Sequence, residues 1–261
     1  MDCFLGVDIG SATTKLVVIN DGKIIGYRIM PTGVQCEETA QDTLTALLKE
    51  LNLDRQHIKG ITSTGYGRRL IRFADNTISE ITANVRGAVW LMRKNEGKVR
   101  TVINIGGQDS KVIAVDEDGM TKNFTMNDKC AAGTGRFLET VTRILEINVT
   151  DLGELSLSAG APIKINSTCA VFAESEIISL VARKKNKSEI IAGAHCSIAR
   201  RIARMVKSVG LIDIVFFDGG PALNKGLVKV LEDELATDIY VPSTPQITVA
   251  LGAALMASGA F

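Results

Sequence analysis

Two cysteines lie at the predicted starts of helices, where a thiol can do redox or metal chemistry. Cys130 stands in NDKCAAGTGRFLE, residues 127–139, ahead of apolar residues spaced as on one helix face. Cys169 stands in NSTCAVFAESEIISL, and Ser167 and Thr168 before it are typical helix N-cap residues. A helix N-terminus favours the thiolate, which binds metals and acts as a nucleophile. The pair therefore indicates metal, redox or nucleophilic chemistry, the alternative being small core thiols or redox-sensing thiols.

An internal repeat indicates phosphate chemistry. FLGVDIGSATTKLVVINDG at 4–22 matches RTVINIGGQDSKVIAVDED at 100–118, and each copy reads as an apolar strand, a glycine turn and a returning strand. Backbone N–H groups at such turns can bind phosphate, and a carboxylate at the strand end, Asp8, can hold Mg²⁺ through water. Two hairpins of this kind could bind one polyphosphate from both sides. The alternative is two ordinary β-hairpins that need glycine only for turn geometry.

Polar side chains accompany both turns. Ser11, Thr13 and Thr14 add hydroxyl donors to the first turn. Lys15 and its counterpart Lys111 either balance the charge of a bound phosphate or lie along their strands.

Composition excludes several classes of protein. The chain has 261 residues and a net charge of +1, so no bulk electrostatic attraction to nucleic acid or membrane is expected. No segment approaches the roughly 20 apolar residues of a membrane span, and MDCFLGVDIG does not resemble a signal peptide. The five cysteines are scattered without CxxC pairs, which favours a reducing, cytoplasmic compartment over a disulfide framework.

The elements that must position these residues read as two α/β units, each βββαβα, with a hinge near 95–98. The first lobe is predicted to comprise 1–97 plus 246–261, and the second 98–245. Ser188 is expected to cap the longest helix and Gly210 to end it. Beyond the hairpins, we expect strands near 58–64, 162–166, 213–217 and 238–241, and helices near 37–51, 77–94, 134–148, 169–183, 188–209, 222–236 and 245–261.

Three motifs together carry a resemblance. VDIGSATTK, INIGGQDSK and FFDGGPALN resemble the phosphate-1, phosphate-2 and adenosine motifs of the acetate and sugar kinase/Hsp70/actin superfamily. The resemblance implies an α/β fold of duplicated actin-like (ribonuclease H-like) lobes with an ATP cleft between them. The nucleotide-binding residues it implies are Gly10, Ser11, Ala12, Thr13, Thr14, Lys15, Gly106, Gly107, Gly219, Gly220, Asn224 and Gln246.

The cysteine segments narrow the resemblance. Together with TGYGR at 64–68 and PQITVALGAA at 245–254, they are similar to activators of 2-hydroxyacyl-CoA dehydratases. That family, of the BadF/BadG/BcrA/BcrD type, includes activators of benzoyl-CoA reductase and reductases of double-cubane cluster proteins. The resemblance implies that Cys130 and Cys169 hold one [4Fe–4S] cluster shared across a homodimer. It also implies ATP-driven transfer of one electron from ferredoxin or flavodoxin to a dehydratase or double-cubane protein. The thiol count agrees, because a cluster needs four thiolates and a twofold dimer of this chain supplies them.

Gln108 and Asp109 are the predicted hydrolytic residues, with Asp8 as the anchor of the metal. A glutamine in a phosphate-binding turn suits the positioning of water, with Asp109 beside it at the γ-phosphate or metal. The alternative is that Gln108 only completes hydrogen bonds of the turn. Asn104 stands where this family usually has Asp, which should weaken metal-water coordination unless Asp109 compensates. Val249 replaces a usual glycine, so close approach of the backbone to nucleotide is not expected there.

Two other functions stay open at this point: a small-molecule kinase, for example for a sugar, and a nucleotide-switched, actin-like binding protein. The basic run ARKKNKS at 182–188 either docks a partner or is a solvated loop. The sequence does not choose between the possible partner enzymes.

Overall fold

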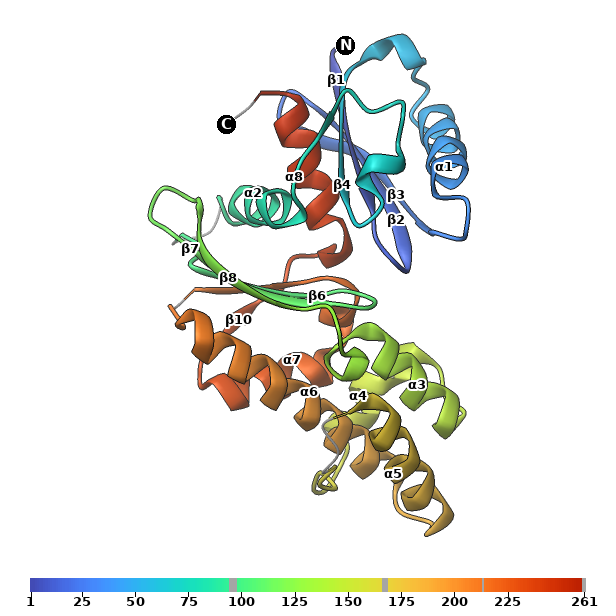
Figure 1. Cartoon of the computed structure of the whole chain (residues 1–261), viewed down its shortest axis with the longest axis vertical. Coiled ribbons are helices and arrows are strands. Elements are labelled where there is room, and N and C mark those ends of the chain that lie inside the picture. Colours follow the sequence, from blue (N-terminus) through green and yellow to red (C-terminus); the bar gives the residue numbers. More distant parts are fainter. Residues whose placement is uncertain (94–97, 166–168, 213, 260–261) are drawn as a thin grey trace. The chain divides into compact units, whose positions relative to one another are not determined.

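The computed structural model describes residues 1–93, 98–165, 169–212 and 214–259 and contains two compact units, each built on a five-stranded sheet (Figure 1). The first unit comprises Met1–Arg100, Val115–Lys122 and Pro242–Phe261. The second comprises Thr101–Ala114 and Asn123–Val241.

The first unit has a mixed sheet with helices on both faces. Its strands, in sheet order, are β3 (Lys23–Pro31), β2 (Thr13–Asn20), β1 (Cys3–Ile9), β4 (Ile58–Gly65) and β5 (Asn76–Thr77). Its helices are α1 (Cys36–Glu50), α2 (Glu80–Met92) and α8 (Thr248–Ala257). Neighbours β1 and β2 are antiparallel, whereas β1 and β4 are parallel. The predicted βββαβα order is found in β1, β2, β3, α1, β4 and α2, with the two-residue strand β5 added before α2.

Strand β1 is buried on both faces because its side chains alternate between two packed layers. Leu5 and Val7 pack with residues of α1 in one core cluster. Gly6, between them, faces α8 so closely that an added Cβ would lie 1.9 Å from the carbonyl oxygen of Ala250. The small residues of α8 therefore let it lie directly on the sheet, as Figure 1 shows for the red helix.

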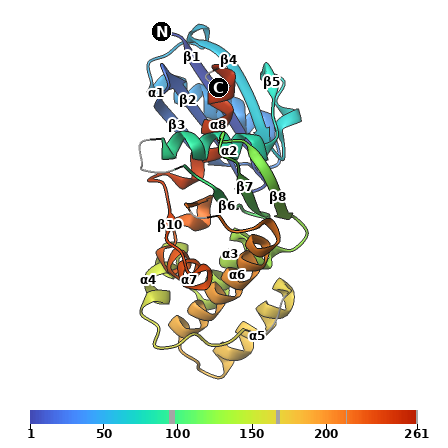
Figure 2. The same ribbon diagram turned by 90° about the vertical axis from the view of Figure 1, so that its left-hand side faces the viewer.

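The second unit repeats this design and adds helices. Its strands, in sheet order, are β10 (Ile239–Tyr240), β9 (Val215–Asp218), β6 (Thr101–Ile105), β7 (Ser110–Val115) and β8 (Thr121–Asn127). Its helices are α3 (Gly135–Leu145), α4 (Leu152–Leu157), α5 (Ala170–Ala182), α6 (Lys187–Val209) and α7 (Lys225–Leu235), which gather on one side of the sheet (Figure 2). One large core joins Ile103 and Phe217 of the sheet to Phe137 and Ile198 of the helices.

Some predicted elements differ from the structure. Residues 162–165 form no strand, because the N–H of Ile163 donates to the carbonyl of Glu189 in α6 and not to a neighbouring strand. The predicted helix at 77–94 starts later, at Glu80, after Ser79 accepts a hydrogen bond from the N–H of Thr82. Helix α4 was not predicted at all, because its six residues are too few to show a clear periodicity.

The long helix α6 also begins differently from the prediction. Its N-cap is Asn186, whose side chain accepts from the N–H of Ser188, so the prediction of Ser188 as the cap is wrong. Gly210 ends the helix as predicted. The basic run at 182–188 extends from the last residue of α5 to the first turn of α6. Within it, Lys187 Nζ donates to the carbonyl of Leu145 at 2.6 Å. Within the described part of the chain, no helix is long and apolar enough to span a membrane.

Candidate functional site

The glycine turn of the first unit joins β1 to β2 and is held closed by backbone bonds. Gly10 N–H donates to the Thr13 carbonyl at 3.1 Å, while exposed Ser11 and half-buried Ala12 form the tip. Thr32, the residue after β3, stabilises the turn: its N–H donates to Ala12 O at 3.0 Å, and its Oγ1 donates to Gly10 O at 2.8 Å. No local motif in the sequence indicates this role of Thr32.

Thr14, predicted as a hydroxyl donor of the first turn, lies inside the fold. Its side chain is fully buried, and its Oγ1 lies 3.1 Å from Oγ1 of Thr32. The hydroxyl therefore helps to fix the turn from inside the fold.

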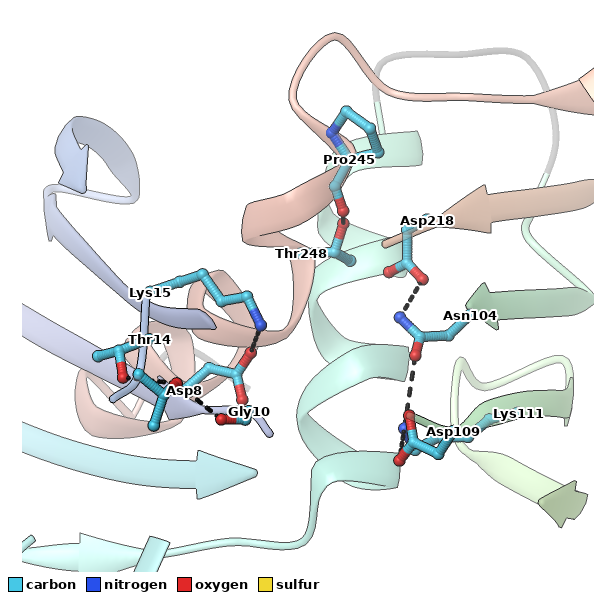
Figure 3. A network of polar contacts seen from close by, with 11 residues as sticks. Asp8, Gly10, Thr14, Lys15, Asn104, Asp109, Lys111, Asp218, Pro245 and Thr248 are labelled. Atoms are coloured by element: carbon cyan, nitrogen blue, oxygen red, sulfur yellow. Dashed lines mark hydrogen bonds and ion pairs between the residues drawn. The ribbon is translucent and has the colours of Figure 1, made fainter. Parts of the chain in front are cut away.

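Asp8, at the end of β1, carries a carboxylate with one oxygen paired and one open. Its Oδ2 accepts from Lys15 Nζ at 2.9 Å, so Lys15 balances the charge of Asp8 within the strand pair (Figure 3). The side chain is 4% exposed, and Oδ1 has no hydrogen-bond partner among the described residues. The Oγ1 of Thr64, on the neighbouring strand β4, is likewise buried without such a partner. Gly65 leaves room for the carboxylate, since a Cβ there would lie 2.4 Å from Oδ1.

The glycine turn of the second unit, between β6 and β7, exposes Gln108. Gly106 N–H donates to the Asp109 carbonyl at 2.9 Å, so the backbone closes the turn. The exposed Gln108 side chain has no hydrogen bond to any other described residue. It is therefore available for a ligand or a water, and it does not complete the hydrogen bonding of the turn.

A buried network of charged and amide groups lies behind this turn (Figure 3). Lys111 Nζ, which is 1% exposed, donates to Asp109 Oδ2 at 2.8 Å and lies 3.5 Å from Asn104 Oδ1. Asn104 Nδ2 donates to Asp218 Oδ1 at 2.6 Å. Sequence reasoning missed Asp218, although a carboxylate at the end of an apolar strand in FFDGG was a usable signal.

The second glycine turn is bonded directly to the segment that follows Cys130. The carbonyls of Gly106 and Gly107 accept from the N–H groups of Gly135 and Arg136, at 2.9 Å each. These N–H groups belong to the first turn of α3, where no partner exists within the helix. Ser110 Oγ also donates to the carbonyl of Gly133. A displacement of the turn must therefore move the start of α3.

The two predicted cluster cysteines head helical segments in the same unit. Cys130 precedes a three-residue 3-10 helix, η3 (Ala131–Gly133), and α3 begins after it. Cys169 is the N-cap of α5. Both are free and half-buried, and η3 packs against α5, so the two segments are neighbours. The predicted N-cap residues 167 and 168 lie outside the described residues.

The predicted adenosine segment is held tightly by the fold. Gly219 has φ +91°, and a Cβ there would lie 2.1 Å from the carbonyl of Ile105, so only glycine fits. The segment continues through a 3-10 helix, η5 (Gly220–Leu223). Asn224 caps α7, because its Oδ1 accepts from Leu227 N–H at 3.0 Å. In the first unit, half-buried Gln246 lies in η6 (Pro245–Ile247), and Val249 is buried in α8.

A buried histidine supports Asn224. His195 lies in α6, is fully buried, and accepts at Nε2 from Asn224 Nδ2 at 3.0 Å. Its Nδ1–H then donates to Ser156 Oγ of α4 at 2.8 Å, which fixes the tautomer. Burial lowers the pKa of His195 from 6.5 to about 4, so the ring is neutral near pH 7. Sequence reasoning had found no use for this residue.

Almost the whole chain matches one family of ATPases. The model of the BadF/BadG/BcrA/BcrD ATPase family matches residues 5–257. The chain belongs to this family. The expected membership is therefore confirmed, and with it the assignment of the chain as an ATPase of the activator type.

Individual members of the BadF/BadG/BcrA/BcrD family match over nearly their full lengths. The 2-hydroxyisocaproyl-CoA dehydratase activator of Clostridioides difficile is 41% identical over 254 residues, covering 97% of this chain and 94% of that protein. The (R)-2-hydroxyglutaryl-CoA dehydratase activating ATPase of Acidaminococcus fermentans is 40% identical over 255 residues, covering 97% and 96%. The solved structure of the activator of the 2-hydroxyisocaproyl-CoA dehydratase from Clostridium difficile with bound ADPNP matches with a TM-score of 0.93 at 41% identity, covering 99% of this chain and 95% of that one. The predicted actin-like fold class is confirmed.

Proposed function

We propose that this chain is an ATP-dependent electron activase that couples ATP hydrolysis to the transfer of one low-potential electron to a partner iron–sulfur enzyme. One observation carries the proposal. The carbonyls of Gly106 and Gly107 cap α3, and the segment from Cys130 to α3 is thus bonded to a glycine turn suited to phosphate. A change in the ligand at the turn would reach the cysteine segment through three hydrogen bonds.

The cysteines fit a shared [4Fe–4S] cluster. Among the described residues, no group of three or more His, Cys, Asp or Glu side chains is placed to hold a metal. Cys130 and Cys169 supply two thiols at the heads of neighbouring segments, and two copies supply the four that a cluster needs. When bound, such a cluster supplies one-electron redox chemistry. Exposed Ala131 and half-buried Ala170 leave the space beside the thiols uncrowded.

The surface next to Cys169 supports a homodimer. Helix α5 follows this cysteine, and its Val171 and Phe172 are each 68% exposed, with Ile178 51% exposed. Exposed apolar side chains this close together are typical of a protein interface. A twofold axis near Cys169 would cover them and bring the second pair of thiols to the same point.

The hairpins support binding of ATP or ADP with Mg²⁺. Magnesium usually keeps several waters and takes few carboxylates, and the open Oδ1 of Asp8 can accept from a metal-bound water. The backbone of residues 10–12 and 106–107 would contact phosphate, and Gly219, Gly220 and Gln246 would border the adenosine. Exposed Gln108 would orient the attacking water, with Asp109 held beside it by Lys111.

The names of the relatives support one class of partner. Both are named as activators of 2-hydroxyacyl-CoA dehydratases, so the proposed electron acceptor is such a dehydratase. A double-cubane cluster protein stays the second proposed acceptor, and only the resemblance of the sequence motifs supports it. The proposed donor is reduced ferredoxin or flavodoxin in the cytoplasm, where free thiols persist.

Anaerobic purification and iron analysis test the proposal. The wild-type protein should be a dimer with about four iron and four sulfide per dimer. Cys130→Ala and Cys169→Ala should each lose most of the iron while still binding ADP. Cys36→Ala is a matched control, because Cys36 is another half-buried thiol, at the start of α1. Its iron content should stay at the wild-type value.

Two outcomes would contradict the proposal. One is an iron-free monomer from an oxygen-free preparation. The other is full iron content in both alanine variants, which would place the metal on different ligands.

A further inference from the structure

Each unit places three polar side chains at the same three positions of its sheet. In the first unit, Asp8 on β1 lies opposite Lys15 on β2 and opposite Thr64 on β4. The set contains one carboxylate, one lysine and one hydroxyl. The carboxylate is on the first strand of the unit.

The second unit carries an equivalent set, but its carboxylate is on a different strand. Asn104 on β6 lies opposite Lys111 on β7 and opposite Asp218 on β9. The strand order and the pairing directions are the same as in the first unit. The set again contains one carboxylate, one lysine and one neutral side chain, but the carboxylate is on the parallel neighbour of the first strand.

Asp218 is close enough to Asn104 to replace a carboxylate there. Asn104 Nδ2 donates to Asp218 Oδ1 at 2.6 Å, and both side chains are buried, with Asp218 fully so. A carboxylate is expensive to bury, and here the amide of Asn104 donates to it. Parallel strands β6 and β9 end at the same edge of the sheet, and glycine turns follow both, at Gly106 and Gly219. Ligands of α/β sheets bind at such carboxyl ends.

We propose that Asp218 supplies the carboxylate of the second phosphate-binding turn in place of residue 104, and that it attracts the magnesium ion of the bound nucleotide through water. This inference rests on the proposed function. It also explains why Asn104 is tolerated: an aspartate there would face Asp218 at hydrogen-bond distance, and two adjacent buried carboxylates repel each other. Asp109 then does not need to compensate, because Asp218 already places a carboxylate beside residue 104.

Calorimetric titration with ADP, with and without Mg²⁺, tests the role of Asp218. In the wild type, Mg²⁺ should strengthen ADP binding. In Asp218→Asn this enhancement should fall about tenfold, whereas the affinity for metal-free ADP should change less than about threefold. Asp233→Asn, an exposed position of α7, is the matched control and should keep the full enhancement.

A charge swap separates metal binding from folding. The double variant Asn104→Asp/Asp218→Thr copies the set of the first unit and should restore the magnesium enhancement that Asp218→Asn loses. Asn104→Asp alone should lower the unfolding temperature. If Asp218→Asn fails to fold, the double variant still decides, because a folded double variant that lacks the enhancement overturns the inference.

The outcomes distinguish this inference from the proposed function. A folded Asp218→Asn protein with the wild-type magnesium enhancement overturns the inference and leaves the proposed function intact. A wild-type protein that binds no ADP at any magnesium concentration contradicts the proposed function itself, and the inference with it.

Discussion

Gln108 and Asp8 show how differently single residues are prepared for a ligand. Gln108 is exposed and makes no hydrogen bond to any described residue, so its position is set only by the turn beneath it. Asp8 is buried, with one oxygen fixed by Lys15 and the other open. A group that orients a mobile water needs freedom until substrate arrives, whereas a metal anchor must be preorganised.

Replacing Gln108 should affect hydrolysis alone. We expect Gln108→Ala to lower the rate constant of ATP hydrolysis about 100-fold, because the attacking water loses its orienting group. The affinity for ADP and the unfolding temperature should stay near the wild-type values, since the side chain supports no other residue. Steady-state phosphate release and calorimetry measure these quantities. Gln41→Ala, on the surface of α1, should leave hydrolysis unchanged, and a Gln108→Ala rate within threefold of wild type would exclude the proposed role.

The predictability of individual residues depended on whether their chemistry is local. Gly106, Asp109 and the cysteines could be proposed from motifs, because adjacent residues determine a turn or a helix start. Thr32 and His195 were not found, since their hydrogen bonds join residues 22 and 29 positions apart. Asp218 stood inside a quoted motif but gains its meaning only when β9 pairs with β6.

At the scale of elements, His195 joins three helices of the second unit. Ser156 belongs to α4, His195 to α6, and Asn224 caps α7. The chain of hydrogen bonds needs a neutral ring, because a protonated Nε2 would present a second donor to Asn224 Nδ2. The helices around the predicted adenosine segment therefore depend on the charge of one imidazole.

This dependence predicts a pH effect on stability. Burial lowers the pKa of His195 to about 4, so the unfolded chain takes up a proton below about pH 6.5 that the folded chain does not. This difference in proton uptake should lower the free energy of unfolding by about 2 kcal/mol as pH falls from about 7.5 to about 5. His195→Gln should lose less stability over this range than wild type does, as measured by urea unfolding of the iron-free protein.

His57 provides the control for this experiment, since the chain has two histidines. His57→Gln should lose as much stability as wild type over the same pH range. An identical loss in His195→Gln and wild type would show that the buried imidazole does not set the slope.

Helices and strands were predicted well where a periodic pattern of apolar residues runs for many residues. They were predicted poorly where tertiary contacts determine the local structure. The hairpins and α6 were recovered because alternation or helical spacing runs for many residues. Residues 162–165 look like a strand, but Ile163 bonds to α6, and nothing local in the sequence shows this. The cap of α6 was misplaced by two residues because Asn186 and Ser188 are both good N-caps.

At the scale of the whole molecule, association is expected to depend on α5. Phe172→Glu should convert the proposed dimer to a monomer and remove iron with it, because the second pair of thiols would be lost. The unfolding temperature of the iron-free chain should change little, since this side chain is mostly exposed. Light scattering and iron analysis measure the two effects. Val149→Glu, at an exposed site outside α5, should remain a dimer, and an iron-loaded dimer of Phe172→Glu would reject this interface.

Helix α8 has a consequence for how the protein is made. It follows every element of the second unit in the sequence but packs on β1, β2 and β4, so Val17 and Ile19 of the hairpin β1–β2 share a core with Leu251. During translation, the apolar face of this sheet stays exposed until the second unit and then α8 have left the ribosome. The core of the second unit does not depend on α8, because it is formed by residues that precede this helix in the sequence. We therefore expect chaperones to bind nascent chains at the first unit, whose synthesis begins before that of the second unit but whose folding is completed after it.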